Sequence, residues 1–196
     1  MIAGMDRVLQ DVPNRDCPKG VSINMSFGNT KSQAVNDAAK ALVCAGYFAA
    51  VAAGNGDIFG NPEDASGSSP ASEPSVCTIG ASAKDDTVAD FSNYGSLIDI
   101  YAPGVDILST WIGGRTNTIS GTSLAKPHIV GPGSYFMSLG KSETGLCVYM
   151  QGIAFDGAII GLPRGTMNWL AHNAPAAYSS IARHTPVETY PLIHRV

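Results

Sequence analysis

The first third of the chain contains three segments with different patterns of apolar and polar side chains. Residues 21–27 alternate with the period of two that a half-buried β-strand requires. Residues 32–46 place apolar side chains at helical spacing, open with a serine suited to cap a helix and end at Gly46. Residues 47–53 are continuously apolar, which is typical of a strand buried on both faces of a parallel sheet. The pattern therefore predicts a strand, a helix and a second strand.

Beyond this unit the pattern predicts a long loop and then short elements. Residues 57–74 are rich in Gly, Pro, Ser and Asn and predict the loop. Residues 174–196 show no clear period and predict an irregular tail. The expected strands are 76–81, 97–102, 107–110 and 116–119, and the expected helices begin near Ser123 and cover 143–153.

Length and charge limit the classes of protein to be considered. The 196 residues suffice for one domain with a buried core. With 12 Lys and Arg against 16 Asp and Glu, the net charge of -4 provides no basic field to attract nucleic acid or an anionic membrane. The longest apolar stretch, 41–53, contains Gly46 and is shorter than the ~20 residues of a membrane-spanning helix. We therefore expect neither nucleic acid nor a membrane as a partner.

The cysteines give no support for a structural zinc site. They have no Cys-x-x-Cys spacing, and the four histidines do not cluster with them. Disulfides remain open on the sequence alone. The four cysteines are Cys17, Cys44, Cys77 and Cys147.

The segment 120–128, Ser-Gly-Thr-Ser-Leu-Ala-Lys-Pro-His, is the strongest candidate for chemistry. It leads Ser123 from a turn of small residues onto the first turn of an expected helix. The free N–H groups and the positive end of a helix stabilise a developing oxyanion, which suits a nucleophilic serine. Because serine is also a common helix cap, the segment by itself leaves both roles open.

The segment closely resembles the nucleophile motif of the subtilisin-like serine proteases, Gly-Thr-Ser-Met-Ala-x-Pro-His. Residues 52–55, Ala-Ala-Gly-Asn, resemble the oxyanion-hole block of the same family, in the same order and separation. The likeness is greatest to the fungal proteinase K branch and covers residues 1–173. It implies an α/β fold with a doubly wound, mostly parallel sheet and flanking helices, and hydrolysis of peptide bonds through an acyl-enzyme. Further similar stretches are 72–81, 91–95, 99–104 and 107–113.

The resemblance assigns roles to individual residues. Ser123 would be the nucleophile, and Asn55 would donate its side-chain amide to the oxyanion, although an asparagine between two glycines also suits a turn. His128 would be structural. The small walls of the substrate cleft imply a roomy, apolar pocket for the side chain before the cleaved bond. These walls would be Ser26, Phe27 and Gly28 on one side and Ala52, Ala53 and Gly54 on the other.

By resemblance the chain also has a disulfide and a calcium site. Cys77 would pair with Cys147, whereas Cys17 would lack its family partner and Cys44 would be a buried free thiol. A Cys17–Cys44 bond is the alternative. A structural Ca2+ would be held by oxygen ligands, as calcium prefers, and these are the carbonyls of Pro74 and Val76 and the carboxylate of Asp99.

A serine nucleophile needs a base and an orienting carboxylate, and the sequence shows neither in the family's form. The family's Asp-Thr/Ser-Gly and His-Gly-Thr-His motifs do not occur in the 196 residues. We therefore expect the C-terminal part of a catalytic domain that lacks the N-terminal elements of the fold and does not turn over substrate by itself. An absent N-terminal segment or pro-region would be a partner beside polypeptide substrates. We expect the parent protein to be secreted and monomeric, with any secretory signal outside this sequence.

Two departures from the family pattern favour a different reading. Lys126 replaces a small residue of the nucleophile helix, and Pro132 followed by Gly133 lies where the family has helix formers, so we expect the helix to bend or break there. The alternative function is a peptide-binding pseudoprotease without catalysis, or a gene fragment without native activity.

Overall fold

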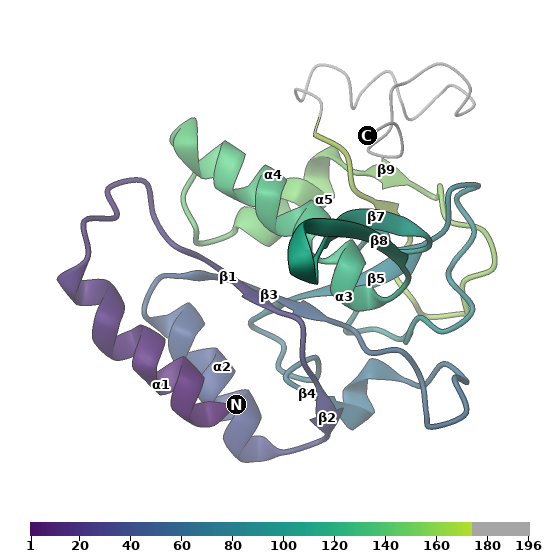
Figure 1. Cartoon of the computed structure of the whole chain (residues 1–196), viewed down its shortest axis with the longest axis horizontal. Helices are drawn as coiled ribbons and strands as arrows, with labels where there is room; N and C mark the ends of the chain where they lie inside the picture. The colour runs from purple at the N-terminus through teal and green to yellow at the C-terminus, as the bar shows by residue number, and fades with distance from the viewer. Residues whose placement is uncertain (174–196) are drawn as a thin grey trace.

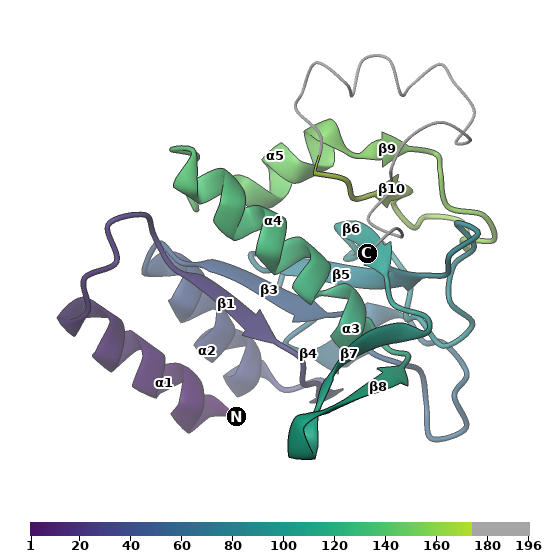
Figure 2. The ribbon, with the colours of Figure 1, turned by 45° about the horizontal axis from the view of Figure 1, so that its top comes forward.

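A six-stranded sheet runs through the middle of the molecule, with helices on both of its faces (Figures 1 and 2). The computed structural model describes residues 1–173, and the expected tail at 174–196 lies outside the described residues. The first five strands in the order β1-β3-β5-β6-β10-β9 are parallel, and β9 is antiparallel to β10. The strands are β1 (Ser22–Met25), β3 (Phe48–Ala52), β5 (Cys77–Ser82), β6 (Ile100–Pro103), β10 (Trp169–Leu170) and β9 (Phe155–Asp156).

The central strand β3 shows why the sheet is covered on both sides. All five of its side chains are buried, and successive residues point to opposite faces. Phe48 and Ala50 belong to one hydrophobic core, whereas Ala49 and Val51 belong to the other. The first core is closed by α4 (Pro127–Ser138) and α5 (Leu146–Ile153), and the second by α1 (Ile2–Asp11) and α2 (Gln33–Cys44).

The remaining elements are short. Two small antiparallel sheets accompany the main one. Among the described residues no helix is long and apolar enough to cross a bilayer. These elements are β2 (Asn29–Thr30) with β4 (Ser68–Ser69), β7 (Ile107–Trp111) with β8 (Arg115–Ile119), the helix α3 (Thr122–Ala125), and the 3-10 turns at Val12–Asn14, Ala65–Gly67 and Ile112–Gly114.

The predicted α/β fold with a mostly parallel sheet is confirmed, and so are the elements of the strand, helix and strand unit. The pattern did not predict α1, which has no side-chain cap and buries only Met5. It also missed β2 and β4, since β4 lies inside the expected loop at 57–74.

Two expectations about individual residues need correction. The expected break of the helix at Pro132 does not occur, since α4 continues through this residue to Ser138. Gly133 lets α4 approach the sheet closely, since a Cβ at this position would lie 2.9 Å from the ring of Phe48. Cys44, expected to be buried, is exposed at the last position of α2. A helical pattern alone does not show which face of the final turn is covered.

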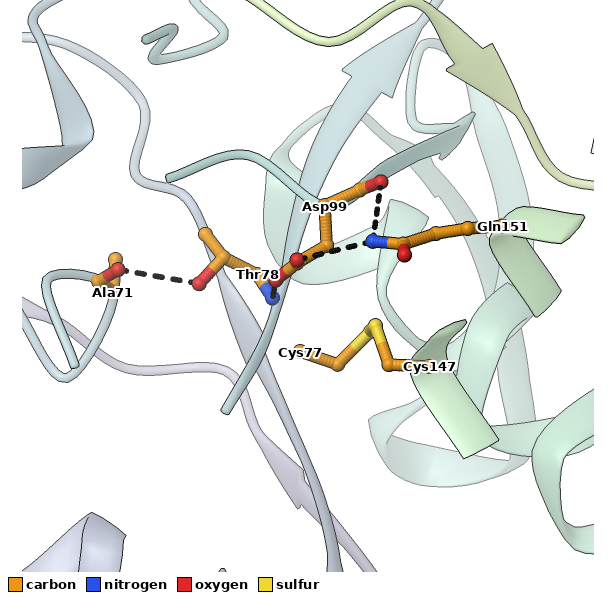
Figure 3. Close-up of a disulfide and its surroundings, with 6 residues drawn as sticks. All are labelled: Ala71, Cys77, Thr78, Asp99, Cys147 and Gln151. Atoms are coloured by element: carbon orange, nitrogen blue, oxygen red, sulfur yellow. Dashed lines mark hydrogen bonds between the residues drawn. A yellow bond between two sulfur atoms is a disulfide. The ribbon is translucent and has the colours of Figure 1, made fainter. Parts of the chain in front are cut away.

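The Cys77–Cys147 disulfide is present, as the resemblance implied, and joins β5 to α5 (Figure 3). The two Cα atoms are 5.8 Å apart and separated by 70 residues in sequence. Cys17 and Cys44 are both free and exposed, so the alternative bond between them is not formed.

Replacing Cys77 and Cys147 together by serine should lower the free energy of unfolding by about 4 kcal/mol, because the bond closes a long loop in the unfolded chain. Urea unfolding of oxidised chains measures the difference. The matched control replaces Cys17 and Cys44, which should leave stability within ~0.5 kcal/mol. Detection of four thiols in the denatured, unreduced wild-type chain would show that the bond does not form.

Candidate active site

The candidate residues lie in three separate segments of the chain and line one open cleft of about 810 Å³. It lies where the carboxyl ends of β1 and β3 meet the start of α3. In parallel α/β sheets this edge is the usual place for a binding site. All eight residues predicted for catalysis and substrate binding line this cleft: Ser26, Phe27, Gly28, Ala52, Ala53, Gly54, Asn55 and Ser123.

The first turn of α3 holds Ser123 and is tied to the opposite wall of the cleft. Pro127 has no N–H, so it leaves the carbonyl of Ser123 without its usual helical donor. The hydroxyl of Ser26, just after β1, donates to this carbonyl at 3.2 Å. The backbone N–H of Ser123 makes no hydrogen bond among the described residues, as expected for the first turn of a helix. It is therefore free to donate to an anionic oxygen.

The side chain of Asn55 is oriented by Thr122. Its Oδ1 accepts hydrogen bonds from the N–H of Thr122 at 2.9 Å and from the hydroxyl of Thr122 at 2.7 Å. Thr122 Oγ1 in turn accepts from the N–H of Gly54 at 3.3 Å. These bonds fix the oxygen of the amide and leave Nδ2 as a donor in the cleft that Ser123 also lines. The cleft therefore holds two potential donors to an anionic oxygen, the N–H of Ser123 and Asn55 Nδ2.

Asn93 positions this region, although sequence analysis assigned no role to this residue. Its buried side chain accepts from the N–H groups of Gly56 at 3.0 Å and Glu63 at 2.9 Å, and donates to the carbonyl of Ala53 at 3.0 Å. Gly54 has a positive φ of 109°, and a Cβ there would collide with the amide of Asn93. The motif at 91–95 contains Asn93, but its bonding partners lie 30–40 residues away, so local sequence does not reveal this role.

One end of the cleft carries negative charge. Asp57, Glu63 and Asp64 line it, whereas none of the described Lys, Arg or His residues does. Hydrogen bonds from Asn61 lower the pKa of Asp57, and hydrogen bonds from Ser66 lower the pKa of Asp64. Both carboxylates therefore remain ionised well below neutral pH.

Lys126 lies one helical turn after Ser123 and is completely buried. Its Nζ has no hydrogen-bond partner within residues 1–173, and burial lowers its pKa to about 7. His128, on the same helix, does not line the cleft, and its Nδ1 lies 2.9 Å from the carbonyl oxygen of Leu124. This contact is compatible with the structural role expected for His128.

No imidazole lies beside Ser123 in the part of the chain that the structure describes. Of the two described histidines, neither His128 nor His172 lines the cleft. His184 and His194 lie outside the described residues. A serine–histidine–carboxylate triad is therefore not assembled within residues 1–173.

Asp99 is held near the disulfide at the start of β6 (Figure 3). One carboxylate oxygen accepts from the N–H of Thr78 at 2.7 Å, and the other accepts from Nε2 of Gln151 at 3.1 Å. Burial raises the pKa of Asp99 to about 6. The nearby sulfurs of Cys77 and Cys147 are joined in the disulfide and are not available as thiolate ligands.

A serine on the first turn of a helix, with an oriented amide donor lining the same cleft, is the kind of arrangement that serine hydrolases of the acyl-transfer class use. The sequence model of the subtilase family matches residues 7–144, and the chain belongs to this family. Its members are serine endopeptidases, and the relatives at about 50% identity place the chain near proteinase K.

Named relatives agree with this assignment. Proteinase T of Parengyodontium album is 52% identical over 173 residues, which are 88% of this chain and 57% of that protein. The cuticle-degrading protease of Metarhizium anisopliae is 51% identical over 175 residues, which are 88% of this chain and 44% of that protein. The chain thus spans about half the length of these relatives. The crystal structure of a cold adapted subtilisin-like serine proteinase matches with a TM-score of 0.80 at 34% identity, covering 89% of this chain and 60% of that one.

Asn93→Ala should lower the free energy of unfolding by about 2 kcal/mol, because it leaves the buried carbonyl of Ala53 and the part-buried N–H groups of Gly56 and Glu63 without their partner. Urea unfolding would measure the loss. Asn24→Ala, at an exposed position of β1, is the matched control and should change stability by less than ~0.5 kcal/mol. Equal effects of the two substitutions would contradict the anchoring role of Asn93.

Proposed function

We propose that this chain carries the nucleophile, the oxyanion hole and the substrate walls of a serine endopeptidase that hydrolyses polypeptides through an acyl-enzyme. The observation that supports the proposal best is the pairing of Ser123 with the free Nδ2 of Asn55 in one cleft. Residues 1–173 would be the nucleophile-bearing part of the peptidase domain.

In the proposed reaction Ser123 Oγ attacks the carbonyl carbon of the peptide bond. The oxygen of that carbonyl becomes negative and receives hydrogen bonds from the N–H of Ser123 and from Asn55 Nδ2. These donors are already oriented, so little reorganisation is needed when the charge develops. The leaving amine takes the proton that Ser123 Oγ gives up, and water then hydrolyses the acyl-enzyme, with one of its protons returning to Ser123 Oγ.

The shape of the cleft supports an extended polypeptide as the substrate. Residues 26–28 follow the edge strand β1 and offer backbone groups with which an extended chain can pair. Residues 52–54 form a wall of small side chains, which leaves room for a large apolar side chain before the cleaved bond. We propose that the parent protein is secreted, and relatives such as the cuticle-degrading protease support this. The proposed substrates are therefore polypeptides in the extracellular medium.

A second candidate is a protein that binds peptides in this cleft without cleaving them. The observation that favours it is the lack of a described imidazole and carboxylate pair at Ser123. The two functions differ in whether Ser123 forms a covalent bond with a ligand.

A tripeptide boronic acid with a C-terminal Phe analogue should form a tetrahedral adduct with Ser123, because boron accepts the serine oxygen and mimics the oxyanion. Boron-11 NMR and calorimetry measure the adduct and its affinity. Ser123→Ala should abolish the tetrahedral signal, and Asn55→Ala should weaken binding about 100-fold, in line with the ~3 kcal/mol expected for such a donor. Ser96→Ala, at an exposed position, is the control and should bind like the wild type.

Binding of the boronic acid that is unaffected by Ser123→Ala would contradict the acyl-transfer function and favour the peptide-binding candidate. No binding by the folded wild-type chain would contradict both.

We also propose that Pro74, Val76 and Asp99 hold a structural Ca2+ through oxygen ligands. Among the described residues no cationic side chain pairs with the largely buried carboxylate of Asp99, which fits a site for a cation. The carbonyl of Pro74 accepts no hydrogen bond within residues 1–173 and is available as a ligand. The ion would stabilise the loop before β5 against the start of β6.

Addition of millimolar Ca2+ to the chelator-treated chain should raise the melting temperature by several degrees, because an ion bound only to the folded state stabilises it. Asp99→Asn should remove most of this increase, whereas Asp90→Asn, at an exposed carboxylate, should preserve it. Differential scanning calorimetry measures both. An equal increase in the wild type and Asp99→Asn would contradict the site.

A further inference from the structure

Two large apolar side chains stand almost fully exposed on a loop beside the cleft. Among the described residues Ile58 is the most exposed large apolar side chain, at 93%, and the adjacent Phe59 is 82% exposed. An exposed apolar residue is common on protein surfaces and needs no explanation by itself. Ile58, however, lines the same cleft as Ser123, whereas Phe59 does not. Ile58 therefore presents apolar surface to whatever occupies the candidate active site.

The loop that carries Ile58 is anchored at both ends by one buried side chain. Asn93 Oδ1 accepts hydrogen bonds from the N–H of Gly56 at 3.0 Å and from the N–H of Glu63 at 2.9 Å. Gly56 has a positive φ of 79°, and a Cβ there would collide with the carbonyl of Asn61. The two ends of the loop are thus held together, and its tip projects at the mouth of the cleft.

The tip itself is closed by Asp57 and Asn61. One carboxylate oxygen of Asp57 accepts from the N–H of Phe59 at 2.8 Å and from the N–H of Asn61 at 3.0 Å, and the other accepts from Asn61 Nδ2 at 3.0 Å. The N–H of Asp57 donates to the carbonyl of Asn61 at 2.9 Å. These bonds order the backbone on both sides of Ile58 before a ligand binds, so a contact with Ile58 costs little conformational entropy.

The rest of the cleft offers little apolar surface. Among the residues that line it, Phe27 and Ile58 have the large apolar side chains. Phe27 is half-buried, and the methyl groups of Ala52 and Ala53 are buried. A large apolar side chain that enters the cleft can therefore be covered by Ile58, and the removal of both apolar surfaces from water favours this contact.

We propose that Ile58 is a specificity-determining residue, which covers a large apolar side chain of the substrate immediately before the cleaved bond. The inference rests on the proposed function, in which residues 52–54 receive this side chain. Because the loop continues directly from residues 52–54 through Asn55, we assign the contact with Ile58 to the same side chain. The preference of the cleft for a large apolar side chain then depends on this loop as well as on the room left by small walls.

Two tripeptide boronic acids that differ only in the C-terminal analogue, Phe or Ala, test the contact in the full chain. Calorimetry measures both affinities, and the wild type should bind the Phe analogue more tightly. Ile58→Ser should lower the ratio of the Phe to the Ala affinity about tenfold, because the apolar contact is lost. Ile58→Leu should keep most of the ratio. Phe59→Ser, on the same exposed tip but outside the cleft, is the matched control and should keep the wild-type ratio.

Methyl NMR reports the contact directly. With carbon-13 in the δ1 methyl groups of isoleucine, the signal of Ile58 is the one that Ile58→Leu removes. The ring of the Phe analogue should shift this signal, and the Ala analogue should shift it much less. A role of Ile58 in the structure of the loop alone would not make the shift depend on the analogue.

Four results would overturn the inference. They are an unchanged ratio in Ile58→Ser, an equal loss of affinity for both analogues, an equal effect of Phe59→Ser, and tighter binding of a C-terminal Lys analogue than of the Phe analogue. The last result would assign this end of the cleft to its carboxylates. Where the tetrahedral adduct with Ser123 still forms, only the role of Ile58 is wrong. If neither analogue forms an adduct with the folded wild-type chain, the proposed function is wrong and the inference fails with it.

Discussion

The burial of β3 on both faces is the constraint on which the site depends. Its alternating side chains join two hydrophobic cores, so the strand cannot slide or rotate without exposing one of them. The packing of β3 therefore fixes the position of the residues that follow it, Ala53 to Asn55. There Thr122 binds Asn55, and Asn93 binds the surrounding backbone. The packing of the sheet therefore fixes the positions of the two donors proposed for the oxyanion hole.

The sequence predicted the parts of the fold that are encoded by local periodicity. The continuous apolar run at 47–53 and the helical spacing at 32–46 both became the expected elements, because each pattern matches only one way of burying its side chains. The motif residues also gather in one cleft, as the resemblance implied. Their catalytic roles, the calcium ligands and the division of the chain at residue 173 remain predictions.

The features that the sequence did not reveal depend on contacts between distant segments. The helix α1 is stabilised by packing on α2 rather than by a cap, and Asn93 acts through partners in another loop. The continuity of α4 through Pro132 has the same origin, because the packing of the helix on Phe48 outweighs the lost backbone bond. Helix propensity is a property of one segment. It does not include the free energy of packing between distant segments, which stabilises these helices.

The parallel pairing of the sheet has a consequence for the speed of folding. Each parallel neighbour of β3 is reached only after a long connection, and Leu170 of β10 pairs with Tyr101 far back in the sequence. Contacts of such high sequence separation slow the search for the native state, because chain entropy is lost before the contacts form. During that time the apolar segment of β3 is open to other chains. Refolding should therefore be slow and favoured by dilution.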